Sequence, residues 1–167
     1  MIEENEKKEG FYFLVKAEGN SRNRYSYRDK VLVLEDVLPE EIKYPEDYGI
    51  VSRTASETGE PLGGFLITNE SMEPGSFVKV KPIAIIRTEN DKIRDDKIVV
   101  VPLEDPNLKD VESLEDIERE ILPDLEKFIQ DKAKIEGKNM EIEDCLGAEK
   151  ANQLIEHCRK IYKRKNK

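Results

Sequence analysis

The chain is poor in the residues that mark several protein classes. It has no tryptophan, one histidine and two cysteines among 167 residues, and aromatic residues make up only 7%. No run approaches the ~20 consecutive apolar residues that a membrane-spanning helix needs. The N-terminus, MIEENEKKEG, lacks the apolar segment of a secretory signal. These absences predict a cytoplasmic protein without a membrane span.

Several catalytic and binding motifs are also missing. Cys145 and Cys158 form neither a disulfide framework nor a metal-ligand spacing. The chain contains no Gly-rich phosphate loop, no Ser-His-Asp set and no zinc spacing. The single histidine, His157, lies beside the apolar face of the last predicted helix, where a surface role is more common than a catalytic one.

Acidic residues outnumber basic ones by 37 to 28, which gives a net charge of −9. This balance argues against broad nucleic-acid binding. It suits a protein that gathers carboxylates around cations, but most acidic surfaces are simply solvated. The C-terminus, RKIYKRKNK, is locally basic, which leaves contact with nucleic acid or an acidic partner open. The same charges also stabilise the C-terminal end of a helix.

Short segments rich in aromatic and β-branched residues predict a series of strands, separated by Gly, Pro, Asn and Asp turns. The predicted strands are Phe11–Val15, Arg24–Arg28, Lys30–Leu34, Gly64–Thr68, Phe77–Arg87 and Ile98–Leu103. Pro82 within the longest of them indicates an edge or a bulge.

After Pro106 the apolar pattern becomes helical. Ser113 and Asp116 form a capping signal before an acidic helix, and a second helix is expected from Pro123 to about Lys134. The last helix is expected to begin near Ala148. One apolar face follows from its 3.6-residue period, formed by Ala151, Leu154, Ile155, Cys158, Ile161 and Tyr162.

Strands followed by helices predict an α+β protein, mainly antiparallel, with a small β-barrel flanked by two or three helices. We expect a flexible charged segment at residues 1–10 and a single domain at 11–167. The barrel is expected to span residues 11–103, and the helices residues 112–165.

One stretch carries a resemblance to a known family. Residues 44–63 read YPEDYGIVSRTASETGEPLG. This resembles the signature region of the soluble family I inorganic pyrophosphatases, where Tyr-Pro-x-x-Tyr-Gly is followed by Thr and then by Asp-Gly-Asp-Pro-x-Asp. The resemblance runs from about Val15 to Tyr162. It implies an OB-like barrel, a homo-oligomer (a dimer or a hexamer), diphosphate as substrate, and Mg²⁺ as cofactor.

The resemblance also implies a set of site residues. The candidates for binding phosphate groups are Arg24, Tyr48 and Lys97. The candidates for binding a metal are Glu18, Glu60 and Asp95. Glu60 aligns with the family's aspartate that orients the attacking water, so it is also the candidate residual base. Mg²⁺ prefers carboxylate oxygens, which explains the need for several converging acids.

Other aligned positions have changed their chemistry. They are Ser26, Asp36, Thr58, Gly63, Asn90, Lys132 and Ala133. Asp36 places an anion where the family has an arginine, and Thr58 and Gly63 remove two of the three carboxylates of the metal loop. Positions that shape the fold are kept, and those that hold metal and phosphate are preferentially altered.

Each retained site residue has a structural interpretation as well as a functional one. Glu60 is either a metal ligand or a solvated loop acid, and Tyr48 is either a phosphate ligand or a packed structural tyrosine. Asp95 and Asp96 either hold a cation or form an ordinary charged turn. Lys97 either faces an anion pocket or pairs with nearby acids.

Our first hypothesis is a pyrophosphatase-like protein whose hydrolytic centre is degraded, inactive or weakly active. Such a protein would serve as an anion-binding, regulatory or assembly subunit. The alternative is an active Mg²⁺-dependent enzyme that hydrolyses diphosphate to two phosphates with a rearranged metal site. In that case Asp91 or Asp96 replaces lost ligands. A third possibility, a barrel that binds nucleic acid, rests only on the basic terminus and the barrel shape.

Overall fold

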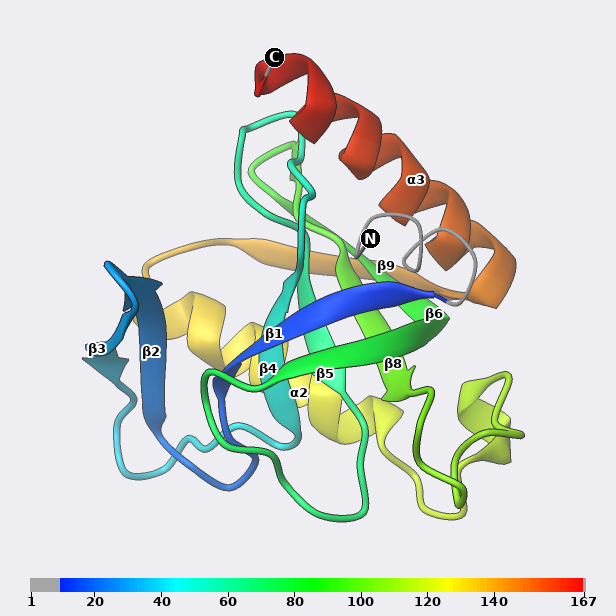
Figure 1. Cartoon of the computed structure of the whole chain (residues 1–167). Coiled ribbons are helices and arrows are strands. Elements are labelled where there is room, and N and C mark those ends of the chain that lie inside the picture. The colour runs from blue at the N-terminus through cyan, green and yellow to red at the C-terminus, as the bar shows by residue number, and fades with distance from the viewer. Residues whose placement is uncertain (1–9, 167) are drawn as a thin grey trace.

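The computed structural model describes residues 10–166 of the chain (Figure 1). Its first six strands are β1 (Phe11–Ala17), β2 (Asn23–Arg28), β3 (Val31–Val37), β4 (Asp47–Val51), β5 (Gly63–Leu66) and β6 (Phe77–Asn90). The later elements are β7 (Ile93–Arg94), β8 (Lys97–Pro102), a 3₁₀ helix (Leu114–Asp116), α2 (Leu122–Ile135), β9 (Met140–Gly147) and α3 (Ala148–Lys165).

Five strands close into a barrel in the order β1-β4-β5-β8-β6, and β6 returns to pair with β1. All of these pairings are antiparallel except β5 with β8, which is parallel. The predicted α+β class and the OB-like barrel with flanking helices are therefore confirmed.

The core has two parts because the central strands are buried on both faces. Phe65 and Leu66, neighbours on β5, belong to different apolar clusters. One cluster draws on all five barrel strands and on the predicted apolar face of α3, including Ile155. The other lies between α2 and the outer side of β5, β6 and β8, and the predicted stripe of Leu125, Phe128 and Ile129 is buried there.

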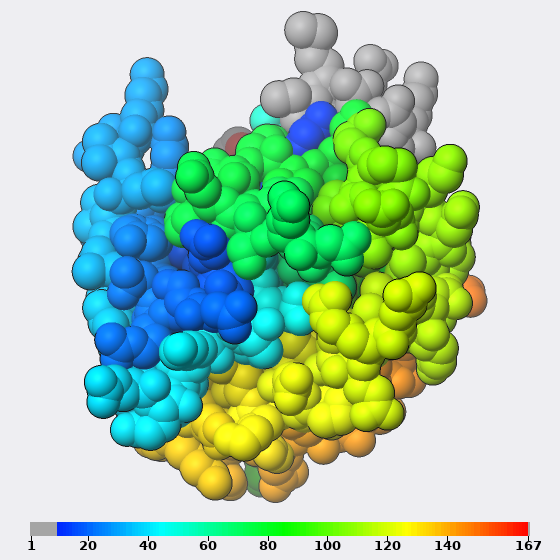
Figure 2. All heavy atoms as spheres, turned by 90° about the horizontal axis from the view of Figure 1, so that it is seen from below, coloured from blue at the N-terminus to red at the C-terminus, as the bar shows by residue number. Residues whose placement is uncertain are grey.

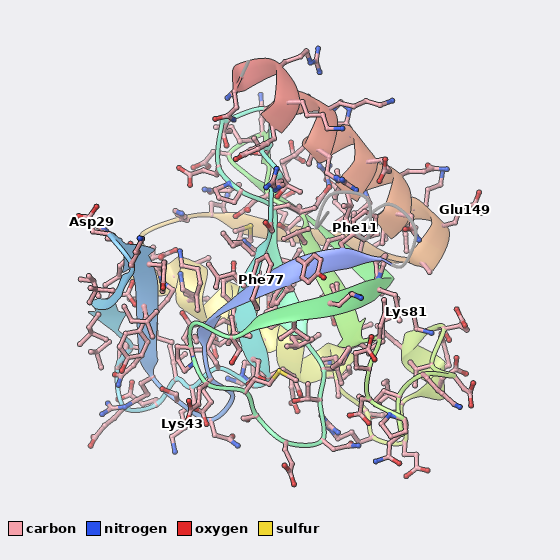
Figure 3. All side chains as sticks on the ribbon, viewed as in Figure 1. Phe11, Asp29, Lys43, Phe77, Lys81 and Glu149 are labelled. Carbon is pink, nitrogen blue, oxygen red and sulfur yellow. The ribbon has the colours of Figure 1, made fainter. Side chains whose placement is uncertain are left out.

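The strands β2 and β3 form a separate two-stranded sheet that projects from the barrel (Figure 1). Asp29 lies at the tip of this hairpin and points away from the body of the molecule (Figure 3). Asp29 and Lys30 have φ values of 51° and 67°, the left-handed geometry that a tight hairpin turn requires.

The prediction of a helix after Ser113 is wrong. Only one 3₁₀ turn forms, and Ile117 returns to an extended conformation. The carboxylate of Asp116 accepts hydrogen bonds from the backbone N–H groups of Glu112 and Ser113, at 2.8 and 3.1 Å. The predicted capping interaction therefore forms. The residues that follow it are mostly acidic, and they lack an apolar stripe long enough to hold a helix against the core.

Three strands were missed by the sequence reasoning, and one of them, β7, has only two residues. β4 lies within the Tyr-Pro signature, and β9 lies within residues 112–165, which were expected to be helical. β9 pairs with β6 from Ala84 to Asn90. Pro82 lies at a register shift between β6 and β8, so the bulge interpretation is the correct one.

The predicted flexible segment at residues 1–10 lies outside the described residues, apart from Gly10. The single-domain assignment stays a prediction. No helix among residues 10–166 is both long enough and apolar enough to cross a membrane.

We expect Leu125→Ala to lower the free energy of unfolding by about 2–5 kcal/mol, because it empties a buried site between α2 and the barrel. Ile135→Ala on the same helix is the control, since its side chain is 47% exposed. Denaturant titration measures both variants, and equal losses would contradict the assigned core.

Candidate functional site

The barrel brings Tyr48 and Lys97 together from two strands on either side of β5. Tyr48 pairs with Phe65 on β5, and Lys97 precedes Ile98, which pairs with Gly64 on the other edge of β5. The Lys97 Nζ donates a hydrogen bond to the Tyr48 hydroxyl at 3.4 Å. It also lies 5.9 Å from the centre of the Tyr48 ring, within the range of a cation–π contact.

Asp95 completes this cluster. Its carboxylate accepts a hydrogen bond from Lys97 Nζ at 3.0 Å. Burial alone would lower the pKa of Lys97, but Tyr48 and Asp95 raise it above its ordinary value. Lys97 therefore keeps its positive charge at neutral pH, and Asp95 already has a cationic partner.

The Tyr48 hydroxyl occupies space that the missing side chain of residue 63 would need. A Cβ atom built on Gly63 would lie 2.7 Å from the Tyr48 Oη. The Tyr48 ring is held by Tyr44 and Phe65, at centroid distances of 5.7 and 5.3 Å. Without a side chain at position 63, the tyrosine hydroxyl and the lysine can approach each other at this point.

A small cavity of about 100 Å³ opens beside Tyr48 and Lys97. Lys132 from α2 and Lys138 also line it. Both bind the carboxylate of Glu136, at 2.8 and 3.5 Å. Burial alone would raise the pKa of Glu136, but the hydrogen bonds and charges of these two lysines hold it below its usual value.

A larger cavity of about 730 Å³ adjoins the small one, and Asp95 and Lys138 line both. Glu60 lies in its wall with the altered positions Thr58, Gly63 and Asn90. The residues aligned with the family's metal loop therefore do gather around one space. Only Glu60 among these four carries a carboxylate.

The neighbouring acid Asp96 is occupied by the protein itself. Its carboxylate accepts hydrogen bonds from the Thr88 backbone N–H and from Arg94, both at 3.0 Å. Arg94 continues to Glu143 on β9 at 2.9 Å. Asp96 thus ties the start of β8 to β6 and β9, which supports a structural role.

Arg24 is held in an ion-pair network on the hairpin. Its guanidinium lies 2.7 Å from Glu35 and 2.9 Å from Asp36. Arg24 and Asp36 are partners in the register of β2 and β3. The anion that replaces the family's arginine therefore neutralises the cation opposite it, and Arg24 offers less charge to a phosphate than the sequence suggested.

Glu18 lies in the turn after β1, and among the described residues it lines neither cavity. Asp91 is also outside both and occupies a left-handed turn position with φ 49°. Within residues 10–166, no three Asp, Glu, His or Cys side chains converge in a manner able to hold a metal ion. The donor set therefore does not fit a cluster of metal ions held by the protein alone.

Sequence reasoning missed Lys138 and counted Lys132 as a loss. The structure places both lysines in the wall of the small cavity, beside Lys97. The available signal was the spacing of Lys132 and Glu136, four residues apart on a helix, which brings a lysine and a carboxylate together. The basic terminus also approaches the metal loop, because a Cβ on Gly59 would lie 2.9 Å from Lys165 Nζ.

We expect Gly63→Ala to lower the free energy of unfolding by about 1–3 kcal/mol, because the new methyl group collides with the Tyr48 hydroxyl. In a Tyr48→Phe background the cost should fall, since the nearest remaining ring atom, Cζ, is 3.4 Å away. A double-mutant cycle by denaturant titration measures this coupling. Strict additivity would contradict the packing described.

Comparison with known proteins identifies the family. The family model for inorganic pyrophosphatase matches residues 13–163. An inorganic pyrophosphatase of Nanoarchaeum equitans is 32% identical over 156 residues, which cover 92% of this chain and 98% of that protein. One from Haloferax volcanii is 29% identical and covers 90% of this chain and 87% of that protein.

Solved structures agree with the sequence comparison. The inorganic pyrophosphatase of Thermus thermophilus superposes with a TM-score of 0.81 at 25% identity, covering 91% of this chain and 90% of that one. The match reaches from β1 to α3, and it includes the Tyr48 and Lys97 strands. The chain belongs to the inorganic pyrophosphatase family.

Proposed function

We propose that this protein binds inorganic phosphate, or one phosphoryl group of inorganic diphosphate, in the small cavity and has lost efficient hydrolysis. The observation that supports this most is that two of the remaining carboxylates, Asp95 and Asp96, already bind cations of the protein itself. Asp95 is bound to Lys97 and Asp96 to Arg94, while Thr58 and Gly63 supply no carboxylate. Three lysines remain around the cavity, so anion binding persists where metal binding weakens.

The size of the effect follows from general electrostatics. Removing one preorganised group that stabilises a transition state costs about 2–4 kcal/mol. Two independent losses of about 2 kcal/mol each would slow the reaction roughly a thousandfold. Such losses are not additive, so the number of replaced groups predicts that the rate falls but does not give the size of the fall.

A working pyrophosphatase is the second candidate, and one observation favours it. Tyr48, Lys97 and Asp95 still form a single cluster beside Glu60. Mg²⁺, the cofactor that the family resemblance implies, is often held by only one or two carboxylates together with substrate phosphates. Glu60 and Asp95 are the residues that would hold it here.

One experiment separates the two candidates. Phosphate release from inorganic diphosphate is measured with Mg²⁺ and with Mn²⁺, beside a calorimetric titration of diphosphate. We expect measurable binding and a turnover far below one per second. Steady turnover at tens per second would support the second candidate and reject the first.

We expect Lys97→Met to weaken diphosphate binding by tenfold or more, because it removes a charged donor from the small cavity. Lys127→Met is the matched control, since that lysine is exposed and pairs with Asp131 on the solvent side of α2. Calorimetry gives both dissociation constants. Equal affinities of the two variants would contradict the location of the site.

We also propose that the protein is a cytoplasmic homo-oligomer, a dimer or a hexamer. The β2–β3 hairpin stands at one edge of the molecule (Figure 2). Its exposed apolar side chains support an interface there. They are Tyr27, Val31, Leu32, Val33, Leu34 and Val37. The outer edge of β3 is also unpaired among the described residues, which favours contact with another strand. A regulatory or assembly role would use such a surface.

Val33→Lys is expected to shift the assembly toward the 19.3 kDa protomer, because it places a charge within the apolar surface of β3. Ile135→Lys serves as the control, as its side chain is similarly exposed on α2. Light scattering after size-exclusion chromatography reports the mass. A monomeric parent protein, or an unchanged mass for Val33→Lys, would reject this interface.

A further inference from the structure

The two adjoining cavities differ in size and in chemistry. The small one, about 100 Å³, is lined by Lys97, Lys132 and Lys138. The large one, about 730 Å³, shares only Asp95 and Lys138 with it. A ligand that filled both would need a compact anionic end and a much larger second part.

The small cavity has room for one phosphoryl group. A water molecule occupies about 30 Å³ in the liquid, so the space corresponds to about three waters. Aromatic rings of Tyr48, Phe65 and Phe128 also line it and limit its expansion. A second phosphoryl group would have to lie past Asp95, in the large cavity.

Charge in the small cavity also favours a weakly charged anion. Its three lysines face two carboxylates, Asp95 and Glu136, each of which binds lysine directly. The formal balance is therefore three positive charges against two negative. A phosphate monoester carries less negative charge than diphosphate, so it demands less neutralisation from this surface.

The large cavity has walls suited to carbon rather than to a second phosphate. Its apolar lining comes from Pro61, Leu62, Ile93, Leu154 and Cys158. Its volume lies within the 300–1,000 Å³ typical of sites for organic ligands. Its charged side chains balance formally, because four acids (Glu57, Glu60, Asp95 and Asp96) stand beside four cations (Arg87, Lys92, Arg94 and Lys138). The large cavity therefore offers a second phosphate no excess of positive charge, and its apolar wall is the larger attraction.

We propose that the preferred ligand is an organic phosphate monoester, with its phosphoryl group in the small cavity and an apolar or aromatic group in the large one. This inference rests on the proposed anion site beside Lys97 and goes further by naming the class of ligand. The loop positions Thr58 and Gly63 explain how the large cavity suits an organic group, because neither presents a carboxylate to it.

Calorimetric titration with inorganic phosphate, inorganic diphosphate, 1-naphthyl phosphate and uncharged 1-naphthol tests this. We expect 1-naphthyl phosphate to bind at least tenfold more tightly than inorganic phosphate and more tightly than diphosphate. 1-Naphthol alone should bind weakly, because it lacks the anionic end that the three lysines hold.

Two variants locate the parts of the ligand. Ile93→Ser removes an exposed apolar side chain of the large cavity, so it should weaken 1-naphthyl phosphate at least threefold and leave inorganic phosphate unchanged. Lys132→Met should weaken both. Ile135→Ser, a similarly exposed isoleucine that lines neither cavity among the described residues, should change neither.

The outcomes separate this inference from the proposed function. Diphosphate binding more tightly than 1-naphthyl phosphate would overturn the organic ligand and leave the anion site standing. An equal effect of Ile93→Ser on phosphate and on its naphthyl ester would also overturn it. Absence of binding by every phosphate would reject both proposals.

Discussion

The contact that organises the site is the hydrogen bond between Lys97 and Tyr48, reinforced by Asp95. It joins two strands that never pair directly, because β5 lies between them. Glycine at position 63 allows it, since a side chain there would displace the tyrosine hydroxyl. In this chain the residue that lacks the family's carboxylate therefore also leaves room for the tyrosine hydroxyl beside Lys97.

Several charged side chains in and around the site are neutralised by oppositely charged residues of the same chain. Asp36 pairs with Arg24, Asp96 with Arg94, and Glu136 with two lysines. Ion pairs within a chain compete with any ligand for the same groups. A site built for metal ions needs carboxylates without partners, whereas these carboxylates already have cations. The surviving lysines of the small cavity are more numerous than its acids, and this leaves a modest attraction for anions.

Much of the fold could be predicted from local patterns, because β1, β6, β8 and the two α-helices bury regular apolar faces. β9 was not predicted because its sequence, MEIEDCLG, is half exposed and lacks a clear apolar pattern. It pairs with β6, which is distant in sequence, only in the folded molecule. In the site, aligned positions such as Glu60 and Asp95 did gather at one cavity. Alignment could not show that Asp36 faces Arg24, or that Lys132 turns toward Lys97's cavity, because these depend on strand register and helix rotation.

The long strand β6 has a consequence for biosynthesis. Its residues 84–90 pair with β9, whose residues follow at least fifty positions later, after α2. While the chain leaves the ribosome, β1 is already present to pair with residues 77–80 and β8 follows β6 closely, but the edge of residues 84–90 that pairs with β9 waits for residues 140–147. An open strand edge during synthesis invites pairing with another nascent chain. Once β9 has been made it covers that edge, and exposed acids along β9, among them Glu141, Glu143 and Asp144, disfavour pairing of its own outer edge with another strand.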